Sequence, residues 1–377
     1  MGAITIIGAA GFVGTRLVES LVLEGRPGVR AVVRAYRSLA GLSRLGPAVD
    51  VRLADAEDPA ALIPAIRGSS VVVNLTTGPP AGISRSTRSI LESCEAAGVG
   101  RLIHLSSAVV YGEVASPCLD DDAPPVAGHW MPYARAKAAA EIWLRGRADA
   151  SPCRVAVLRP GIVWGVRSPH TRGVAAAILE GRAYLVGDGR GVFNSIYSDN
   201  LVECIRACCD HRGDVRGFYN VADREYITWG DFYSALAGPL GRDAARIPGV
   251  PADRFPWSTR AAMEYVQALP GVNGLYHRLK ARLPDTLKSR VKRRLAGRYE
   301  YGPGAAGRAP RPTVDREGWH LQKARHKLPA AKFAEHFGFT QPVTFEEGIR
   351  RTLRWLGPLG HGPSPTAGPI ERSRGLR

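Results

Sequence analysis

Short apolar runs rich in β-branched residues alternate with amphipathic stretches over the first 165 residues of the chain. The runs have the composition of buried strands, and they lie at 3–7, 29–33, 49–53, 71–75, 102–105 and 155–158. The stretches at 15–24, 60–66 and 84–97 have the spacing of helices that cover a sheet. This alternation predicts an α/β fold with a parallel sheet covered on both faces.

The pattern becomes mixed after residue 165, which predicts a second, smaller lobe. Its expected elements are a strand at 184–186, a helix at 200–209, a strand at 218–221, a helix beginning at 228–231 and two short helices within 329–356. The first domain therefore spans 1–165, with later segments returning to its sheet, and the smaller mixed lobe spans 166–356.

Two segments differ in composition from these domains. Residues 241–312 are rich in Pro, Gly and Arg and are expected to form an insertion in the smaller lobe. Residues 357–377 are rich in Gly, Pro and Ser and are expected to be a disordered tail.

Three glycines spaced three apart follow the first predicted strand. In such a turn Gly8 permits a sharp bend, Gly11 lets the backbone approach a ligand, and Gly14 lets the helix pack closely. The helix N-terminus supplies unpaired N–H groups and a dipole that favours an anion. The turn therefore predicts a site for the pyrophosphate of a dinucleotide, and the alternative is a glycine-rich turn without a ligand.

Tyr133 and Lys137 are four residues apart among good helix formers, which places both on one face of a helix. A phenol titrates at about pH 10, and a neighbouring ammonium lowers that pKa, so Tyr133 is a candidate to exchange a proton with a hydroxyl or carbonyl. Lys137 is the only lysine before Lys280 in a chain that otherwise uses arginine. The alternative is a surface helix with an incidental lysine.

The predicted strand at 102–105 ends in Ser106 and Ser107. The carboxyl ends of parallel strands face the ligand crevice, so a hydroxyl there can hold a reacting oxygen near Tyr133. Alternatively, both serines only satisfy backbone groups at the strand end.

Together these motifs resemble the extended short-chain dehydrogenase/reductases, in the large epimerase, dehydratase and reductase branch, over residues 3–237 and weakly over 329–356. The matching segments are Gly8-x-x-Gly11-x-x-Gly14, Ser106-Ser-x-x-Val-Tyr-Gly112, Tyr133-x-x-x-Lys137, Leu158-Arg-Pro-Gly-Ile-Val-Trp-Gly165 and Thr344-Phe-Glu-Glu-Gly-Ile349. The resemblance implies a Rossmann-like, doubly wound parallel sheet with a smaller C-terminal substrate lobe. It also implies Tyr133 as acid/base, Lys137 lowering its pKa and binding the nicotinamide ribose, and Ser107 orienting the substrate oxygen.

The same resemblance implies an NAD(P) cofactor and the residues that hold it. Asp55 would contact the adenine, Leu75-Thr76-Thr77 would lie along the cofactor, and Pro160 would lie near the nicotinamide. The full set expected to bind the cofactor is Gly8, Gly11, Phe12, Val13, Gly14, Arg34, Asp55, Ala56, Leu75, Thr76, Thr77, Tyr133, Lys137 and Pro160. No metal site is expected.

Arg34 follows the second predicted strand, where an acidic residue would bind the ribose 2′-hydroxyl of NAD. Arg37 lies close by, and arginine suits a 2′-phosphate, so we expect NADP in preference to NAD. The alternative is that Arg34 stacks on the adenine without contacting a phosphate.

The substrate is indicated by residues 187–200, which resemble the family's substrate-lobe strand and following helix. Many nucleotide-sugar members grip the pyrophosphate with an arginine before this strand, whereas Phe193 takes that place here and Arg190 is the nearest substitute. Asn200 replaces an expected acid, and no Asp-Glu pair follows Ser107, which argues against a sugar 4,6-dehydratase.

A nucleotide sugar remains the leading substrate, and an NAD(P)-dependent oxidoreductase or epimerase acting on a sugar hydroxyl or carbonyl is the leading function. One alternative is an NADPH-dependent carbonyl reductase of a sterol- or flavonoid-like substrate. The other is a non-catalytic, dinucleotide-binding regulator.

The net charge of +17 belongs to the C-terminal third of the chain. Residues 1–240 hold 25 Lys and Arg against 23 Asp and Glu, whereas residues 241–377 hold 26 against 11. Within 275–298 apolar residues recur every four positions among basic ones, although Pro284 interrupts a single helix. We favour a helical cap on the substrate lobe over peripheral contact with an anionic membrane, and no stacking platform supports nucleic acid as a partner.

The remaining features indicate the compartment. We find neither a signal peptide nor an apolar run long enough to cross a bilayer. The six cysteines form no C-x-x-C pair and are expected to be buried in a reducing cytoplasm. We therefore expect a cytoplasmic enzyme with a small-molecule substrate, with peripheral membrane contact at the inner face as the second hypothesis and a homodimer as the family implies.

Overall fold

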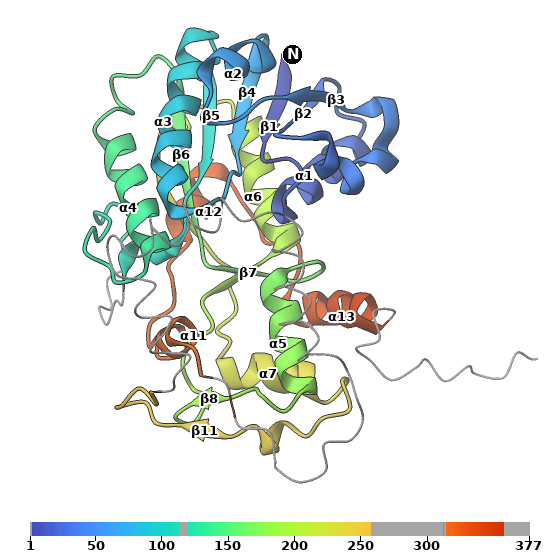
Figure 1. Ribbon diagram of the computed structural model, residues 1–377, viewed down its shortest axis with the longest axis vertical. Helices are drawn as coiled ribbons and strands as arrows, with labels where there is room; N and C mark the ends of the chain where they lie inside the picture. Colours follow the sequence, from blue (N-terminus) through green and yellow to red (C-terminus); the bar gives the residue numbers. More distant parts are fainter. Residues whose placement is uncertain (1, 113–119, 258–311, 313, 358–377) are drawn as a thin grey trace, which may run out of the picture.

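The structure, a computed structural model, describes residues 2–112, 120–257, 312 and 314–357. Seven parallel strands form one sheet in the order β10-β6-β5-β4-β1-β2-β3 (Figure 1). The strands are β1 Ala3–Ile7, β2 Val29–Val33, β3 Asp50–Leu53, β4 Ser69–Asn74, β5 Arg101–Leu105, β6 Arg154–Pro160 and β10 Gly217–Val221. This sheet confirms the Rossmann-like fold expected from the sequence.

Helices cover both faces of the sheet (Figure 1). One core joins the sheet to α1 Phe12–Leu23 and α6 Ser198–Asp210, and α12 Ala331–Phe337 packs beside β10. A second core joins the opposite face to α2 Pro59–Ile66, α3 Pro80–Ala96 and α4 Pro132–Arg145. The double winding follows from strands that are apolar on both faces.

The β-branched composition of β1 explains its central place in the sheet. Ile6 packs into the core that contains α1, and its neighbour Ile7 packs into the core that contains α2. Successive side chains of a strand point to opposite faces, so the continuous apolar run supplies both cores. Four of the cysteines take part in these cores, Cys204 and Cys208 in the first and Cys94 and Cys153 in the second.

The smaller lobe lies beyond the carboxyl edge of the sheet (Figure 1). Its two short parallel pairs are β7 Ile162–Trp164 with β9 Ser195–Tyr197, and β8 Leu185–Val186 with β11 Gly249–Val250. Its helices are α5 Pro169–Leu179, α7 Trp229–Ala237, α11 Arg316–Leu321 and α13 Phe345–Leu356. An aromatic core that includes Trp164, Phe193 and Phe232 holds the lobe together.

Four short 3-10 helices complete the described elements: η1 Tyr36–Gly41, η2 Ser43–Ala48, η3 Ala108–Tyr111 and η4 Ala244–Arg246. The helices α5 and α11 and the short strands β7 and β11 of the smaller lobe were not expected from the sequence. The basic pattern at 275–298 and the tail from residue 358 lie outside the described residues.

Within the described ranges no helix combines the length and the apolar character needed to cross a bilayer. The same ranges hold no group of three or more His, Cys, Asp and Glu side chains with the geometry of a metal site.

Candidate functional site

The turn between β1 and α1 has little room for any residue other than glycine. Gly8 has a φ of +84°, and a Cβ on it would lie 2.9 Å from the carbonyl carbon of Leu75. A Cβ on Gly14 would lie 2.3 Å from the carbonyl oxygen of Gly8. The bend and the close helix contact expected from the glycine spacing are therefore both present.

The first turn of α1 is open toward this bend. Gly11 is the N-cap, no side chain caps the helix, and the first turn carries no acidic residue. An uncapped helix N-terminus with free amide donors and a positive dipole suits an anion. The N–H groups of Phe12 and Val13 belong to this turn, so the residues present fit the pyrophosphate of a dinucleotide.

Two further predicted cofactor residues follow β2 and β3 at the same edge of the sheet. Arg34 is exposed directly after β2, and Asp55 is exposed two residues after β3. The hydrogen bond from Ala54 N to Val33 O, 3.1 Å long, brings the two strand ends together. Asp55 accepts a bond from Glu57 N at 3.0 Å and so shapes its own turn. Ala56, the residue after Asp55, packs against the second core.

The end of β4 touches the glycine turn. Leu75 N donates to Ile7 O at 2.9 Å, and the backbone and hydroxyl of Thr76 donate to the Asn74 side chain at 3.0 Å and 2.7 Å. Leu75 is buried, Thr76 is half-buried and Thr77 is exposed. The chain therefore passes from the core to the surface over these three residues, beside Gly8.

The helix that carries Tyr133 and Lys137 forms as the sequence predicts. Pro132 occupies the first turn of α4, where its missing N–H costs no helical hydrogen bond. Lys137 is 2% exposed, and its Nζ donates to Leu105 O, the last residue of β5, at 2.8 Å. Tyr133 is half-buried one turn earlier, with its ring centroid 6.0 Å from Nζ.

The pKa of Tyr133 departs from the sequence expectation. Burial and the nearby carboxylate of Glu317 raise the pKa of Tyr133 to about 12, whereas proximity to Lys137 was expected to lower it. Burial also lowers the pKa of Lys137 to about 8, partly offset by Glu141. The expectation was wrong in direction because it counted the ammonium and left out burial of the phenol.

Ser106 and Ser107 follow β5 and have different partners. Ser107 is half-buried at the N-cap of η3, where its Oγ accepts a 3.3 Å bond from Val109 N. Ser106 is buried and donates to Oε2 of Glu141 at 2.9 Å. The structure therefore leaves Ser107 as the more accessible hydroxyl at the strand end, beside α4, which packs against η3.

Pro160 lies at the β6 side of the candidate site. It is the last residue of β6 and is buried, and Gly161 N bonds to Val221 O at 3.1 Å. Directly before it, Arg159 is fully buried and paired with Glu141 of α4. This pair was not predicted from the sequence, although a charged residue inside an apolar strand signals that a partner is needed.

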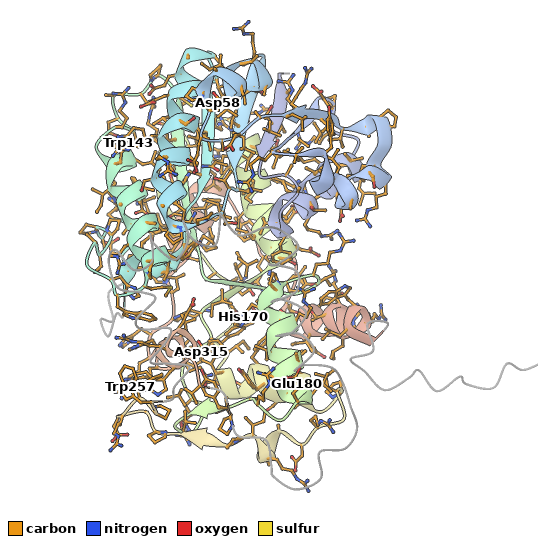
Figure 2. All side chains as sticks on the ribbon, in the orientation of Figure 1. Asp58, Trp143, His170, Glu180, Trp257 and Asp315 are labelled. Carbon is orange, nitrogen blue, oxygen red and sulfur yellow. The ribbon has the colours of Figure 1, made fainter. Side chains whose placement is uncertain are left out.

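The short helix α11 lies close to Tyr133 and was also missed. The Arg316 guanidinium lies 4.3 Å from the ring centroid of Trp130, and that ring lies 5.8 Å from the ring of His320. Figure 2 shows Asp315, which caps α11 by accepting from Gly318 N, in the substrate lobe below α4 of Figure 1. The Asp N-cap was the available signal for this helix.

Comparison with known proteins identifies related chains. A 2-alkyl-3-oxoalkanoate reductase from Stenotrophomonas maltophilia is 31% identical over 212 residues, covering 52% of this chain and 62% of the reductase, which is less than two thirds of its length. An N-acetyl-alpha-D-glucosaminyl-diphospho-ditrans,octacis-undecaprenol 4-epimerase from Escherichia coli is 26% identical over 261 residues, covering 66% of this chain and 74% of the epimerase.

Solved structures share the fold. The UDP-glucuronic acid 4-epimerase of Bacillus cereus, in complex with UDP-glucuronic acid and NAD, superposes with a TM-score of 0.66 at 16% identity and covers 95% of this chain and 99% of that one. The model of the NAD dependent epimerase/dehydratase family matches residues 4–222, more than half of the chain, from β1 to just beyond β10. The chain therefore belongs to the NAD dependent epimerase/dehydratase family.

Proposed function

We propose that the protein catalyses NAD(P)-linked oxidation or reduction at a carbon that carries a hydroxyl or carbonyl group. The register of α4 carries this proposal, because it buries Lys137 against β5 and leaves Tyr133 half-buried at the edge where the glycine turn lies. Tyr133 exchanges the proton, Ser107 orients the reacting oxygen, and Lys137 holds the ribose. A bound nicotinamide supplies or accepts the hydride.

The protonation states of Tyr133 and Lys137 suit Tyr133 to the role of proton donor. With its pKa raised to about 12, Tyr133 is a neutral phenol at neutral pH and can donate its proton to an oxygen that gains negative charge. Lys137, with a pKa of about 8, is mostly protonated at pH 7 and stabilises the phenolate that remains. An epimerase would use the same residues in both directions.

The substrate lobe favours a substrate other than a nucleotide sugar. Phe193, at the position of the diphosphate-binding arginine, is fully buried in a stack with Phe232 at 4.2 Å and an edge contact with Trp229 at 4.7 Å. Arg190, the nearest substitute, extends to the surface and pairs with Asp188 at 3.0 Å. Phe193 carries no charge, and the guanidinium of Arg190 is paired with Asp188, so neither residue offers an unpaired positive charge to a diphosphate.

We therefore propose, as the preferred activity, the reduction of a carbonyl group on a non-sugar substrate. The 2-alkyl-3-oxoalkanoate reductase supports it by its named reaction, whereas the undecaprenol-linked sugar epimerase and the UDP-glucuronic acid epimerase support the sugar alternative. The apolar stack around Phe193, which offers no positive charge to a diphosphate, is the observation that leads us to prefer the non-sugar alternative.

Arg34 supports NADP as the preferred cofactor, because its exposed guanidinium follows β2 where the 2′-substituent of the ribose is bound in this fold. The side chain of the second arginine, Arg37, lies outside the described part. We keep NAD as the alternative, since the UDP-glucuronic acid 4-epimerase named above was solved with it.

Further parts of the proposal rest on the sequence. We assign cofactor binding to residues 1–165 and substrate binding to 166–356. We also propose a homodimeric, cytoplasmic enzyme, with peripheral membrane contact through 275–298 as a separate hypothesis. Sedimentation velocity tests the dimer, and flotation with anionic liposomes at low salt tests the membrane contact.

The proposed function is tested by identifying the nicotinamide cofactor that co-purifies or binds. Mass spectrometry of the denatured protein, followed by titration with NADPH and NADH, separates the alternatives. An empty site that binds NADPH and oxidises it with carbonyl substrates supports a reductase, whereas tightly held NAD supports an epimerase. Binding of neither dinucleotide contradicts the proposal.

A further inference from the structure

Glu141 and Arg159 form an ion pair with no exposed side-chain surface. Arg159 Nε lies 3.0 Å and 3.1 Å from the two carboxylate oxygens of Glu141, and Arg159 Nη2 contacts Oε1 as well. Such a pair adds little net stability, because removing both charges from water costs about as much as their attraction returns. Its role is therefore indicated by what it holds in place.

All three segments of the proposed site are attached to this pair. Ser106, at the end of β5, donates to Oε2 of Glu141 at 2.9 Å. Glu141 lies one turn after Lys137 on α4. Arg159 directly precedes Pro160 at the end of β6. One buried contact thus joins β5, α4 and β6 at the edge where the reaction is proposed.

Arg159 also holds the segment that follows Ser107. Its Nη1 donates to the hydroxyl of Tyr111, 2.5 Å away, and to the carbonyl of Asp121 at 2.9 Å. The Tyr111 hydroxyl donates in turn to Oδ1 of Asn220 on β10 at 2.7 Å. The end of η3 is therefore tied to β6 through the Arg159 guanidinium and to β10 through the Tyr111 hydroxyl.

We propose that Glu141 and Arg159 are positioning residues that hold Ser107, the Tyr133–Lys137 helix and Pro160 in one catalytic arrangement. This inference rests on the proposed function. It assigns no contact with substrate to either residue. Displacements of about 1 Å can reduce a rate by about a hundredfold, so an anchor common to three segments has a measurable effect on turnover.

The pair also acts on the charge of Lys137. The Glu141 carboxylate opposes the loss of the Lys137 proton that burial favours. His104 on β5 is uncharged at neutral pH, because burial and Lys137 lower its pKa to about 3. The phenol of Tyr133, whose ring centroid lies 6.0 Å from Nζ, is neutral at neutral pH, and Arg159 pairs with the same Glu141 carboxylate. Loss of the carboxylate should therefore move the deprotonation of Lys137 to lower pH.

The test uses two changes at the pair and one matched control. Glu141→Gln removes the charge and keeps the shape, and the double change Glu141→Leu with Arg159→Met replaces the pair by apolar groups that leave no charge unpaired. The control is Arg101→Met, because Arg101 is another buried arginine, at the opposite end of β5, bonded to the carbonyls of Cys208 and Cys209.

The readouts are the melting temperature, kcat, KM and the pH profile. We expect the double variant to melt near the wild type, with kcat at least tenfold lower and KM changed less than threefold. As pH rises, we expect Glu141→Gln to lose its activity at a lower pH than the wild type does, because Lys137 loses its proton earlier. Arg101→Met should lower the melting temperature and leave kcat and the pH profile unchanged. A folded double variant with the wild-type kcat and profile would overturn the inference.

Hydrogen exchange separates this inference from the proposed function. In the double variant, backbone amides at 106–112 should exchange at least tenfold faster, while those at 101–104 keep their protection. Unchanged exchange at 106–112 counts against positioning even if the wild type is active. A wild type without any NAD(P)-linked activity counts against the proposed function, and the exchange result still decides on the anchor.

Discussion

Lys137 Nζ donates a 2.8 Å hydrogen bond to the carbonyl oxygen of Leu105. The bond joins the buried face of α4 to the last residue of β5, two residues before Ser107. An ammonium with 2% exposure needs such an acceptor, because burial without a partner disfavours its charge. The proposed proton donor, ribose ligand and substrate-orienting hydroxyl are thus set on one strand end and one helix face.

Replacing Lys137 by Met should abolish most activity without unfolding the protein. The apolar side chain fills the same space, but the positive charge beside Tyr133 is lost, so kcat/KM should fall about a hundredfold or more. Lys332→Met is the control, because Lys332 pairs with the exposed Asp122 at 2.7 Å. Steady-state kinetics on both variants checks this, and a Lys137 variant as active as the control would contradict it.

Replacing Gly14 by Ala should weaken both stability and cofactor binding. The added Cβ would lie 2.3 Å from Gly8 O, which forces the turn to shift at a cost of roughly 1–3 kcal/mol. Gly173→Ala in α5 is the control, since its Cβ would meet open space and alanine favours a helix by up to about 1 kcal/mol. Urea unfolding and dinucleotide titration measure both effects. Equal unfolding free energies in the two variants would refute the crowded turn.

Replacing Arg34 by Ala should change the choice of cofactor. Loss of a charge-assisted contact with a 2′-phosphate should weaken NADPH binding by roughly 10- to 100-fold and leave NADH binding within about twofold. Arg52→Ala on β3, where Arg52 pairs with Asp50 at 2.8 Å, is the matched surface change. Fluorescence titrations measure the affinity of each variant for NADPH and NADH. An equal loss of affinity for both dinucleotides would rule out a contact with the 2′-phosphate.

Asp223 should make stability depend on pH between about 4 and 6. Burial raises its pKa from 3.8 to about 6, although Asn200, Trp164 and Tyr197 donate to its carboxylate. The folded state thus binds the proton more tightly than the unfolded state. Asp223 therefore adds roughly 3 kcal/mol to the free energy of unfolding below about pH 4. This contribution is lost as pH rises through about 6.

Urea unfolding at a series of pH values tests the role of Asp223. The variant Asp223→Asn cannot titrate, so its unfolding free energy should lack this fall between pH 4 and 6, whatever its overall stability. An identical pH dependence in the variant and the wild type would assign the effect to other groups.

The elements that the sequence predicted best are those specified by local pattern. The apolar runs located every strand of the main sheet to within a few residues, and the four-residue spacing of Tyr133 and Lys137 placed both on α4. The crowded turn at Gly8 follows from glycine spacing after a strand. In each of these cases neighbouring residues alone determine the conformation.

The features that the sequence analysis missed depend on contacts between distant segments. Helix α11 has an Asp N-cap as its local signal but is only six residues long, and its contacts are with the distant residues Trp130 and Trp229. The partner of Arg159 is Glu141, 18 residues earlier and on another element. The raised pKa of Tyr133 depends on burial that no local pattern records.

The most direct test of the central claim is the Tyr133→Phe variant, assayed for NAD(P)H-linked turnover and for dinucleotide binding. Removing the hydroxyl deletes the proton donor and keeps the ring, so we expect kcat to fall by about 10²- to 10⁴-fold while the dissociation constant of the dinucleotide changes less than about threefold. Full turnover in the Tyr133→Phe variant would contradict the assignment of Tyr133 as the acid/base of this site.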